Sequence, residues 1–411
     1  MGFPLKTFGK IILMACTSGT RNIKSKLNLH MKTSLRCCFI LVHIVLCTFT
    51  LEAQTNSPLV QFGEPYILHS KILNQNRHYW VSLPESYHAK GSHQRYPVLY
   101  VLDAEWDFYL DCPVMQFMAE SRQVPDFIVV GVPNMDRERD LTPTPYPNEP
   151  SSGGGPLFER FLNEELAREI NAKFRTVPYR ILVGHSAGGA LAADTFLRQT
   201  NGFQGYIAID PALGWVNQDL IRLAKEFVPQ TKSRAAIFIA TAGWRDLNPT
   251  NVMTCAQQLF VSILRTNSSP SIRIGYELES EDHSSSRLLG LYDGLRFIFD
   301  GYKPMDLLVL NTPLLINNHF KQLSNRLGFQ ILPPEGLVND IGDALEDAHE
   351  PERAVDCLKL NISNYPTSAW AFRHLAYAYL AAGKKQLAIQ NYQEALKLDS
   401  KIPPLPANVT E

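Results

Sequence analysis

Residues 181–193 read ILVGHSAGGALAA, and this stretch decides the fold. A run of apolar residues leads into Gly184, and an alanine-rich segment of helical character follows Gly188. Glycine at such a junction costs backbone entropy and offers nothing to pack, so it indicates a tight turn. G-x-S-x-G between a strand and a helix is typical of a nucleophile elbow, which lifts the serine hydroxyl clear of the sheet. We therefore predict that Ser186 is a nucleophile, and that a larger side chain at either glycine collides with neighbouring backbone.

Apolar runs alternate with helical patterns from about residue 60 to residue 300. The runs are short and rich in Val, Ile and Tyr, and they lie at 96–103, 127–132, 179–184, 205–210 and 235–243. Between two of them, one helical face is formed by Leu157, Phe158, Phe161, Leu162, Leu166 and Ile170. Segments 66–70 and 78–84 are expected to add an antiparallel pair at one edge. Buried strands separated by helices predict an α/β fold, with a mostly parallel central sheet and helices on both faces.

A serine hydroxyl is a poor nucleophile until a base removes its proton, and in this fold the chain order is serine, acid, histidine. His283 follows the strand-like segment 271–278 and precedes a helical pattern, which is where the base belongs. His319 is the alternative, although it is expected to be a surface residue. We exclude His185, because adjacent side chains in such a turn point apart.

The sequence offers more than one candidate for the acid that orients the histidine. Asp246 follows the run 235–243, the commonest site for the acid in this fold, and is our first assignment. Asp210 ends the preceding run and is the alternative acid, unless it only bonds the turn at Pro211. Glu281, Asp282 and a serine–histidine pair without an acid also remain open.

Acyl transfer further requires N–H groups directed at the developing oxyanion, each worth about 3 kcal/mol. The backbone N–H of Ala187, at the start of the helix after the serine, is the first expected donor. The second is expected from Ala104 or Glu105, which follow the run 96–103.

Several large side chains lie close to the carboxyl ends of the predicted strands, where ligands bind in open α/β sheets. Trp106, Trp215 and Trp244 are expected either to line an acyl pocket or to be ordinary core aromatics. Arg137 and Arg139 are expected either to bind a polar part of the substrate or to form ion pairs within their loop.

Composition excludes several classes of function. The net charge is −1 and no basic run is interleaved with aromatic residues, which argues against a nucleic-acid partner. The sequence contains no H-E-x-x-H, no C-x-x-C and no phosphate-binding glycine loop. We therefore expect no cofactor and no metal.

Residues 31–54 read MKTSLRCCFILVHIVLCTFTLEAQ, the basic, apolar and small-residue order of a secretory signal peptide. We expect translation to start at Met31, residues 1–53 to be an N-terminal extension and signal peptide, and the mature chain to begin near Gln54. That predicts a periplasmic or secreted protein without a membrane span after cleavage. Four of the seven cysteines precede the cleavage site, and no disulfide framework is expected from the other three, Cys112, Cys255 and Cys357.

The chain changes character after the expected hydrolase domain at 54–304. A connector at 305–334 is amphipathic, and 335–401 are expected to form two tetratricopeptide-like repeats. The second repeat is indicated by Phe372, Leu375, Ala376, Tyr379, Ala388, Tyr392 and Ala395, and the first by Val338, Ile341, Gly342, Leu345, Ala354, Leu358 and Asn361. The repeats are expected either to bind a protein partner through Trp370, Arg373 and Tyr377 or to cap and stabilise the enzyme.

RHYWVSLPESY, YPVLYVLDAEWDF, VGVPNMDRERDLTP, GHSAGG, DPALGW and DHSSSRLLGLYDGLRFIF occur in an order that resembles the putative esterase family, over about residues 60–300. Its members include esterase D-like enzymes, siderophore esterases and feruloyl esterases. The resemblance implies an α/β-hydrolase fold with Ser186 as nucleophile and His283 as base. Many members carry a serine and paired tryptophans where this chain has residues 210–215, and some use a dyad.

These observations predict a serine hydrolase that cleaves a small carboxylic ester, of siderophore, hydroxycinnamate or another type, through an acyl-enzyme. Two alternatives remain: an acyltransferase on the same fold, and a non-catalytic binding protein that acts through the repeats. The intact serine and histidine argue against the second alternative.

Overall fold

A computed structural model describes residues 62–89, 93–198, 202–214, 219–227, 234–243 and 252–405. Residues from Phe62 onward form one compact unit. The expected signal peptide and its cleavage site lie outside the described residues, so export stays a prediction. Within the described residues, no helix combines the length and the apolar character needed to cross a membrane.

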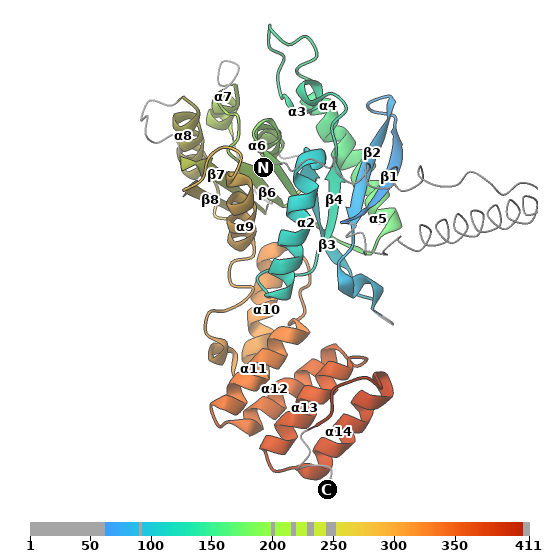
Figure 1. Cartoon of the computed structure of the whole chain (residues 1–411). Helices are drawn as coiled ribbons and strands as arrows, with labels where there is room; N and C mark the ends of the chain where they lie inside the picture. Colours follow the sequence, from blue (N-terminus) through green and yellow to red (C-terminus); the bar gives the residue numbers. More distant parts are fainter. Residues whose placement is uncertain are drawn as a thin grey trace, which may run out of the picture. The chain divides into compact units, whose positions relative to one another are not determined.

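Among the described residues, an eight-stranded sheet forms the centre of this unit, in the order β1-β2-β4-β3-β5-β6-β7-β8 (Figure 1). Its strands are β1 (Glu64–Ser70), β2 (Gln75–Ser82), β3 (Tyr96–Leu102), β4 (Ile128–Val132), β5 (Thr176–His185), β6 (Gly205–Ile209), β7 (Ala235–Ala242) and β8 (Ile272–Glu279). All pairings from β4 to β8 are parallel, whereas β1–β2 and β2–β4 are antiparallel. The expected antiparallel addition at one edge is confirmed.

Helices cover both faces of the sheet. Successive side chains of each strand point to opposite faces, so each strand contributes to two apolar clusters. In β3, Leu99 and Val101 belong to the apolar cluster that includes α2 (Ala104–Glu120) and α9 (Ser286–Ile298). Tyr100 and Leu102 belong to the cluster on the other face. That face carries α4 (Gly155–Arg160), α5 (Ala167–Lys173), α6 (Ala187–Arg198), α7 (Asp219–Glu226) and α8 (Val252–Asn267). This architecture fits an α/β-hydrolase fold.

The segment that carries the expected helical face, from Leu157 to Ile170, is built from three helical pieces. A π-helical segment, Phe161–Leu166, joins α4 to α5. Most of the expected apolar face is buried, but Leu157 is half exposed, so its assignment to that face was wrong. The inserted π-helical turn rotates the face relative to α4, which a uniform helical period does not anticipate.

Further helices follow the sheet. They are α10 (Pro313–Leu327), α11 (Glu335–Asp347), α12 (Pro351–Asn364), α13 (Ala369–Ala381) and α14 (Lys385–Leu398). The starts of α11 and α13 are 34 residues apart, as are those of α12 and α14. This spacing agrees with the expected repeat length, and the tetratricopeptide assignment itself stays a prediction.

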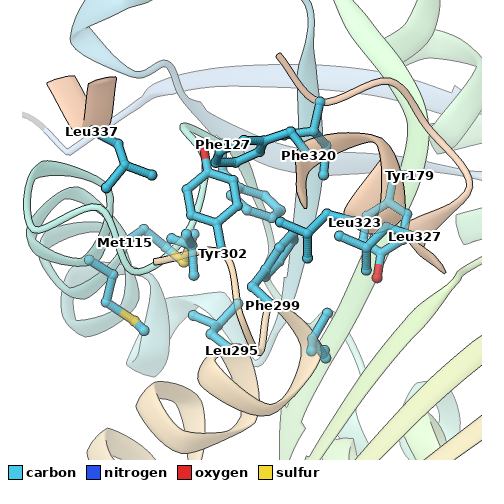
Figure 2. Packing of buried hydrophobic residues seen from close by; sticks show 14 of the residues in the cluster. Met115, Phe127, Tyr179, Leu295, Phe299, Tyr302, Phe320, Leu323, Leu327 and Leu337 are labelled. Atoms are coloured by element: carbon cyan, nitrogen blue, oxygen red, sulfur yellow. The ribbon is translucent and has the colours of Figure 1, made fainter. Parts of the chain in front are cut away.

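The first of these helices share an apolar core with the sheet (Figure 2). The Tyr179 ring on β5 lies 4.9 Å from that of Phe329, between ring centroids, and Tyr302 lies 6.0 Å from Phe320 on α10. Leu337 on α11 belongs to the same cluster, and Arg122 forms an ion pair of 2.9 Å with Asp340. The contacts favour a stabilising role for α10 and α11.

We expect Phe320→Ala to lower the unfolding free energy by about 3–5 kcal/mol, because it removes a fully buried aromatic ring from this core. Leu314→Ala on the same helix is the matched control. Leu314 is 68% exposed, so its truncation is expected to cost less than about 0.5 kcal/mol. Urea denaturation followed by near-ultraviolet circular dichroism measures both.

A variant that ends at Pro304 extends the test by removing every helix from α10 onward. It is expected to aggregate or to melt at least about 10 °C below the full chain, since several apolar side chains are uncovered together. A soluble variant with an unchanged melting temperature would contradict the shared core, as would equal effects of the two alanine substitutions.

Candidate active site

Ser186 lies at the junction between β5 and α6 in a left-handed backbone conformation, with φ of 59°. Non-glycine residues adopt this conformation at a cost, and the surrounding hydrogen bonds maintain it. Its N–H donates to the carbonyl oxygen of Ile209 at 2.9 Å, and its own carbonyl accepts from Ala190 and Ala212. The turn is therefore anchored to the end of β6 as well as to α6.

The two glycines of the motif are required for different reasons. A Cβ at Gly184 would lie 2.4 Å from the carbonyl atoms of Gly188, which confirms the predicted collision with backbone. A Cβ at Gly188 would first meet a side-chain oxygen of Asp103, at 3.2 Å. The predicted backbone collision was wrong there, because α6 turns Gly188 toward the end of β3.

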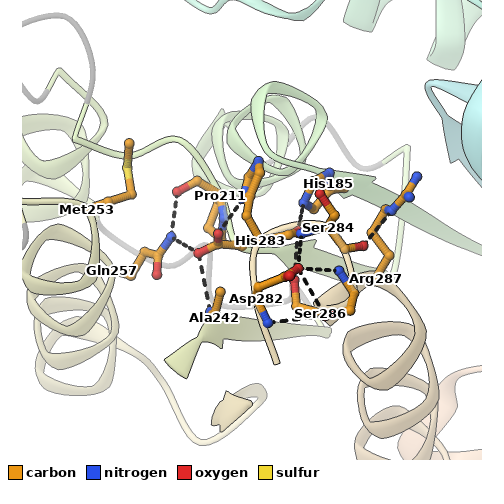
Figure 3. Close-up of polar contacts among 12 residues, drawn as sticks. His185, Pro211, Ala242, Met253, Gln257, Asp282, His283, Ser284, Ser286 and Arg287 are labelled. Atoms are coloured by element: carbon orange, nitrogen blue, oxygen red, sulfur yellow. Dashed lines mark hydrogen bonds and ion pairs between the residues drawn. The ribbon is translucent and has the colours of Figure 1, made fainter. Parts of the chain in front are cut away.

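His283 follows β8, and Asp210 follows β6. The Nδ1 of His283 lies 2.5 Å from Oδ2 of Asp210. The other carboxylate oxygen accepts from Gln257 Nε2 at 3.0 Å and from the N–H of Ala242 at 3.3 Å, which Figure 3 shows as dashed lines. Asp210 is 1% exposed. A buried, fixed carboxylate orients the imidazole and leaves its Nε2 for another partner.

The other candidates for acid and base have different surroundings. Asp246 lies outside the described residues. Asp282 accepts from the N–H groups of Ser284 and Ser285, so it shapes the loop that carries the histidine. His319 contacts the carbonyl oxygen of Gly301 at 2.7 Å.

A pocket of about 420 Å³ brings the serine and the histidine to one surface. Its lining consists of Asp103, Trp106, Asp107, Tyr109, Arg137, His185, Ser186, His283, Ser284 and Arg287. Two of the predicted substrate-binding residues, Trp106 and Arg137, therefore line this pocket. Trp215 and Trp244 lie outside the described residues. Arg139 does not belong to this lining. It pairs with the buried Asp140 at 2.8 Å, which is the ion-pair alternative that we left open.

The two arginines of the pocket are each bonded to an aspartate of the same lining, Asp103 or Asp107. Arg137 binds Asp103 with two nitrogens, at 2.8 and 3.0 Å, and its guanidinium lies 5.5 Å from the centre of the Trp106 ring. Arg287 binds Asp107 at 2.6 Å. Burial raises the pKa of Asp107 to about 6, and the bond from Arg287 opposes that rise. Both guanidiniums are therefore fixed in place.

Sequence reasoning missed Asp103, Asp107 and Arg287. Asp103 is the last residue of the run 96–103, and Asp107 lies one helical turn later. Arg287 lies one turn after His283, at the start of α9. The position of Asp103 directly after a predicted strand was a usable signal, but the pairing of Asp107 with Arg287 depends on how α2 packs against α9.

The expected oxyanion donors lie at helix starts. Ala187 begins α6 and Ala104 begins α2. The N–H groups of Trp106 and Asp107 bond to the carbonyl of Asp103, so the amides of Ala104 and Glu105 come before the helical ladder. Amides in that position are suited to an anionic oxygen.

His185 was excluded as the base, and its ring lies against that of His283, with centroids 4.3 Å apart. Its Nε2 lies 2.6 Å from the backbone carbonyl oxygen of His283. The pKa of His185 is lowered to about 4. Burial is the largest cause, and the neighbouring His283 is the second largest. His185 is consequently neutral near pH 7.

The described residues hold no cluster of three or more His, Cys, Asp or Glu side chains that is arranged to bind a metal ion. Among the described cysteines, Cys112 and Cys357 are buried thiols that form no disulfide.

Comparisons with known proteins support an esterase-related fold. Residues 70–217 match the sequence model of a family described as putative esterase. That range includes Ser186 and Asp210 and ends before His283. No curated protein matches the sequence.

Among solved structures, the chain is similar to an IroE-like serine hydrolase from Shewanella oneidensis, with a TM-score of 0.62 and 26% identity over 73% of this chain and 98% of that chain. An uncharacterised protein from Capnocytophaga ochracea has a TM-score of 0.57 and 22% identity, over 81% of this chain and 93% of that one. The BES protein from Bacillus cereus has a TM-score of 0.53 and 24% identity, over 60% and 97%. The last two show the fold alone.

The lowered pKa of His185 predicts a loss of stability in acid. The unfolded chain takes up a proton at this residue near pH 6.5, whereas the folded chain does so only near pH 4. Stability from this group is therefore complete above about pH 7 and falls as the pH decreases toward 4, by about 3 kcal/mol.

The measurement compares wild type with His185→Gln by urea denaturation at pH 7, 6, 5 and 4. Other groups near the site, such as Asp107, His283, Arg287 and Asp210, are common to both proteins, so the difference isolates residue 185. We expect wild type to lose about 3 kcal/mol more than the variant. Parallel pH dependences would show that His185 is protonated as readily in the folded chain as in the unfolded one.

Proposed function

We propose that this protein is a serine hydrolase that cleaves a carboxylic ester through an acyl-enzyme. One observation carries the proposal: Ser186, held at φ of 59° on a tight turn, lines the same pocket as His283, whose Nδ1 is bonded to a buried aspartate. The match to the esterase family over residues 70–217 and the likeness to a serine hydrolase support the reaction class.

In the proposed reaction, His283 Nε2 removes the proton from Ser186 Oγ as the oxygen attacks the ester carbonyl. Asp210 keeps the proton of the neutral imidazole on Nδ1, and it stabilises the imidazolium that forms. The tetrahedral oxyanion takes hydrogen bonds from the N–H of Ala187 and from an amide at the start of α2, Ala104 or Glu105.

Collapse of the tetrahedral intermediate breaks the bond to the leaving alcohol, which receives the proton from His283. The acyl group remains on Ser186. A water molecule then attacks this ester while His283 again acts as base, and the carboxylic acid is released. Apart from the ester and one water molecule, no group from outside this chain takes part in either half of the proposed reaction.

Ser186→Ala tests the nucleophile. We expect kcat for p-nitrophenyl butyrate to fall by at least about 1,000-fold, because nothing else at the elbow can form the acyl-enzyme. The smaller side chain is tolerated by the turn, so the melting temperature is expected to stay within a few degrees. A folded variant that kept a tenth of the wild-type rate would remove Ser186 from the mechanism.

Asp210→Asn and Asp246→Asn form a matched pair that identifies the acid. We propose Asp210, because its carboxylate contacts Nδ1 of His283, and we expect Asp210→Asn to lower kcat by about 100- to 10,000-fold. Asp246→Asn is expected to leave kcat within about 2-fold of wild type, because Asp210 then already serves as the acid. Stopped-flow or steady-state hydrolysis of p-nitrophenyl acetate measures both variants.

The opposite ranking would return the role of the acid to Asp246. Two silent variants would indicate that His283 works with Ser186 alone, as a dyad. Either result leaves the proposed nucleophile and reaction class intact.

A further inference from the structure

Two contacts hold the base from opposite sides. Asp210 binds the His283 ring at Nδ1, whereas His185 reaches the backbone of the same residue, with its Nε2 at 2.6 Å from the carbonyl oxygen. A carbonyl oxygen only accepts hydrogen bonds, so Nε2 of His185 carries the hydrogen and donates it. His185 is therefore the tautomer protonated at Nε2.

The donor comes from the residue next to the nucleophile. His185 is the last residue of β5 and directly precedes Ser186. His283 lies in the short connection between β8, which ends at Glu279, and α9, which begins at Ser286. Without a contact across to β5, the backbone of the base would be fixed only relative to its own loop and helix.

Within the part of the chain that the structure describes, the other hydrogen bonds of this connection are local. Asp282 accepts from the N–H groups of Ser284 and Ser285, and the Ser286 hydroxyl donates to the same His283 carbonyl at 3.1 Å. These bonds shape the loop, as Figure 3 shows around Asp282, but they do not relate it to the elbow. The bond from His185 does.

The charge of His185 also suits this place. During the proposed reaction His283 becomes a cation, and a second cation with its ring centroid 4.3 Å away would oppose that step. Because burial lowers the pKa of His185 to about 4, the residue donates its hydrogen bond without carrying charge at neutral pH.

We propose that His185 is a positioning residue, which fixes the backbone of His283 to the strand that carries Ser186 and thereby sets the approach of the base to the nucleophile. The inference rests on the proposed function. In this role His185 exchanges no proton with the substrate. What matters is the hydrogen-bond donor at Nε2, and not the space that the ring fills.

His185→Gln and His185→Met are a matched pair of similar length. Glutamine carries an amide N–H at about the position of Nε2, whereas methionine fills similar space without a donor. We expect His185→Met to lower kcat for p-nitrophenyl acetate by about 10- to 100-fold with KM changed less than about 2-fold, since a small displacement of a catalytic group affects the chemical step. Glutamine is expected to restore kcat to within about 5-fold of wild type.

His319→Met is the control for loss of such a bond elsewhere, because His319 also contacts a backbone carbonyl, that of Gly301 at 2.7 Å. It is expected to leave kcat unchanged. Thermal melts of all variants separate misfolding from misplacement. If the methionine variant does not fold, His185→Asn replaces it, since the shorter amide falls short of the carbonyl and is expected to give the same loss of kcat.

A methionine or asparagine variant with wild-type kcat would overturn the inference. So would equal losses in the glutamine and methionine variants at equal melting temperature, because the donor would then be irrelevant. Ser186→Ala is measured alongside: if it stays active, the proposed function itself fails, whereas an inactive Ser186→Ala beside an active His185→Met refutes only the role of His185.

Discussion

The close approach of Gly184 to Gly188 is the constraint on which the site depends. With only hydrogen at Gly184, the end of β5 can pass against the first turn of α6, and Ser186 is held in the left-handed conformation between them. The same turn is bonded to β6 through Ser186 N–H to Ile209 and Ala212 N–H to Ser186. Ser186 and the strand end that precedes Asp210 are therefore fixed to each other by backbone hydrogen bonds, before any side chain contributes.

The parts of the site that local chemistry dictates could be predicted from the sequence. Glycines around a serine between a strand and a helix specify the elbow, and chain order after it leaves His283 as the candidate base. The choice between Asp210 and Asp246 could not be made this way, because both follow neighbouring buried runs. It depends on where a loop after β8 carries the imidazole, and in the structure that loop reaches Asp210. A single sequence contains no local signal for this distance.

The same distinction applies to the C-terminal helices. The 34-residue spacing of their starts agrees with the pattern of small and apolar residues that predicts repeats in the sequence. Their attachment to the sheet is not visible, since it depends on aromatic side chains from distant segments, including Tyr179, Phe299 and Phe320. None of these residues belongs to the repeat pattern. The choice between a separate adaptor and a stabilising cap is therefore a question about the connector rather than about the repeats.

The pocket beside Ser186 has a charge balance that bears on what it can accept. Arg137 and Arg287 each bond to a buried carboxylate, Asp103 and Asp107 respectively. Moving either guanidinium fully onto an anionic substrate would leave a carboxylate buried without its partner, which costs several kcal/mol. The arginines can therefore offer only the N–H groups that point away from their aspartates. The two arginines therefore neutralise the carboxylates beside them rather than supply net positive charge that would draw in an anion.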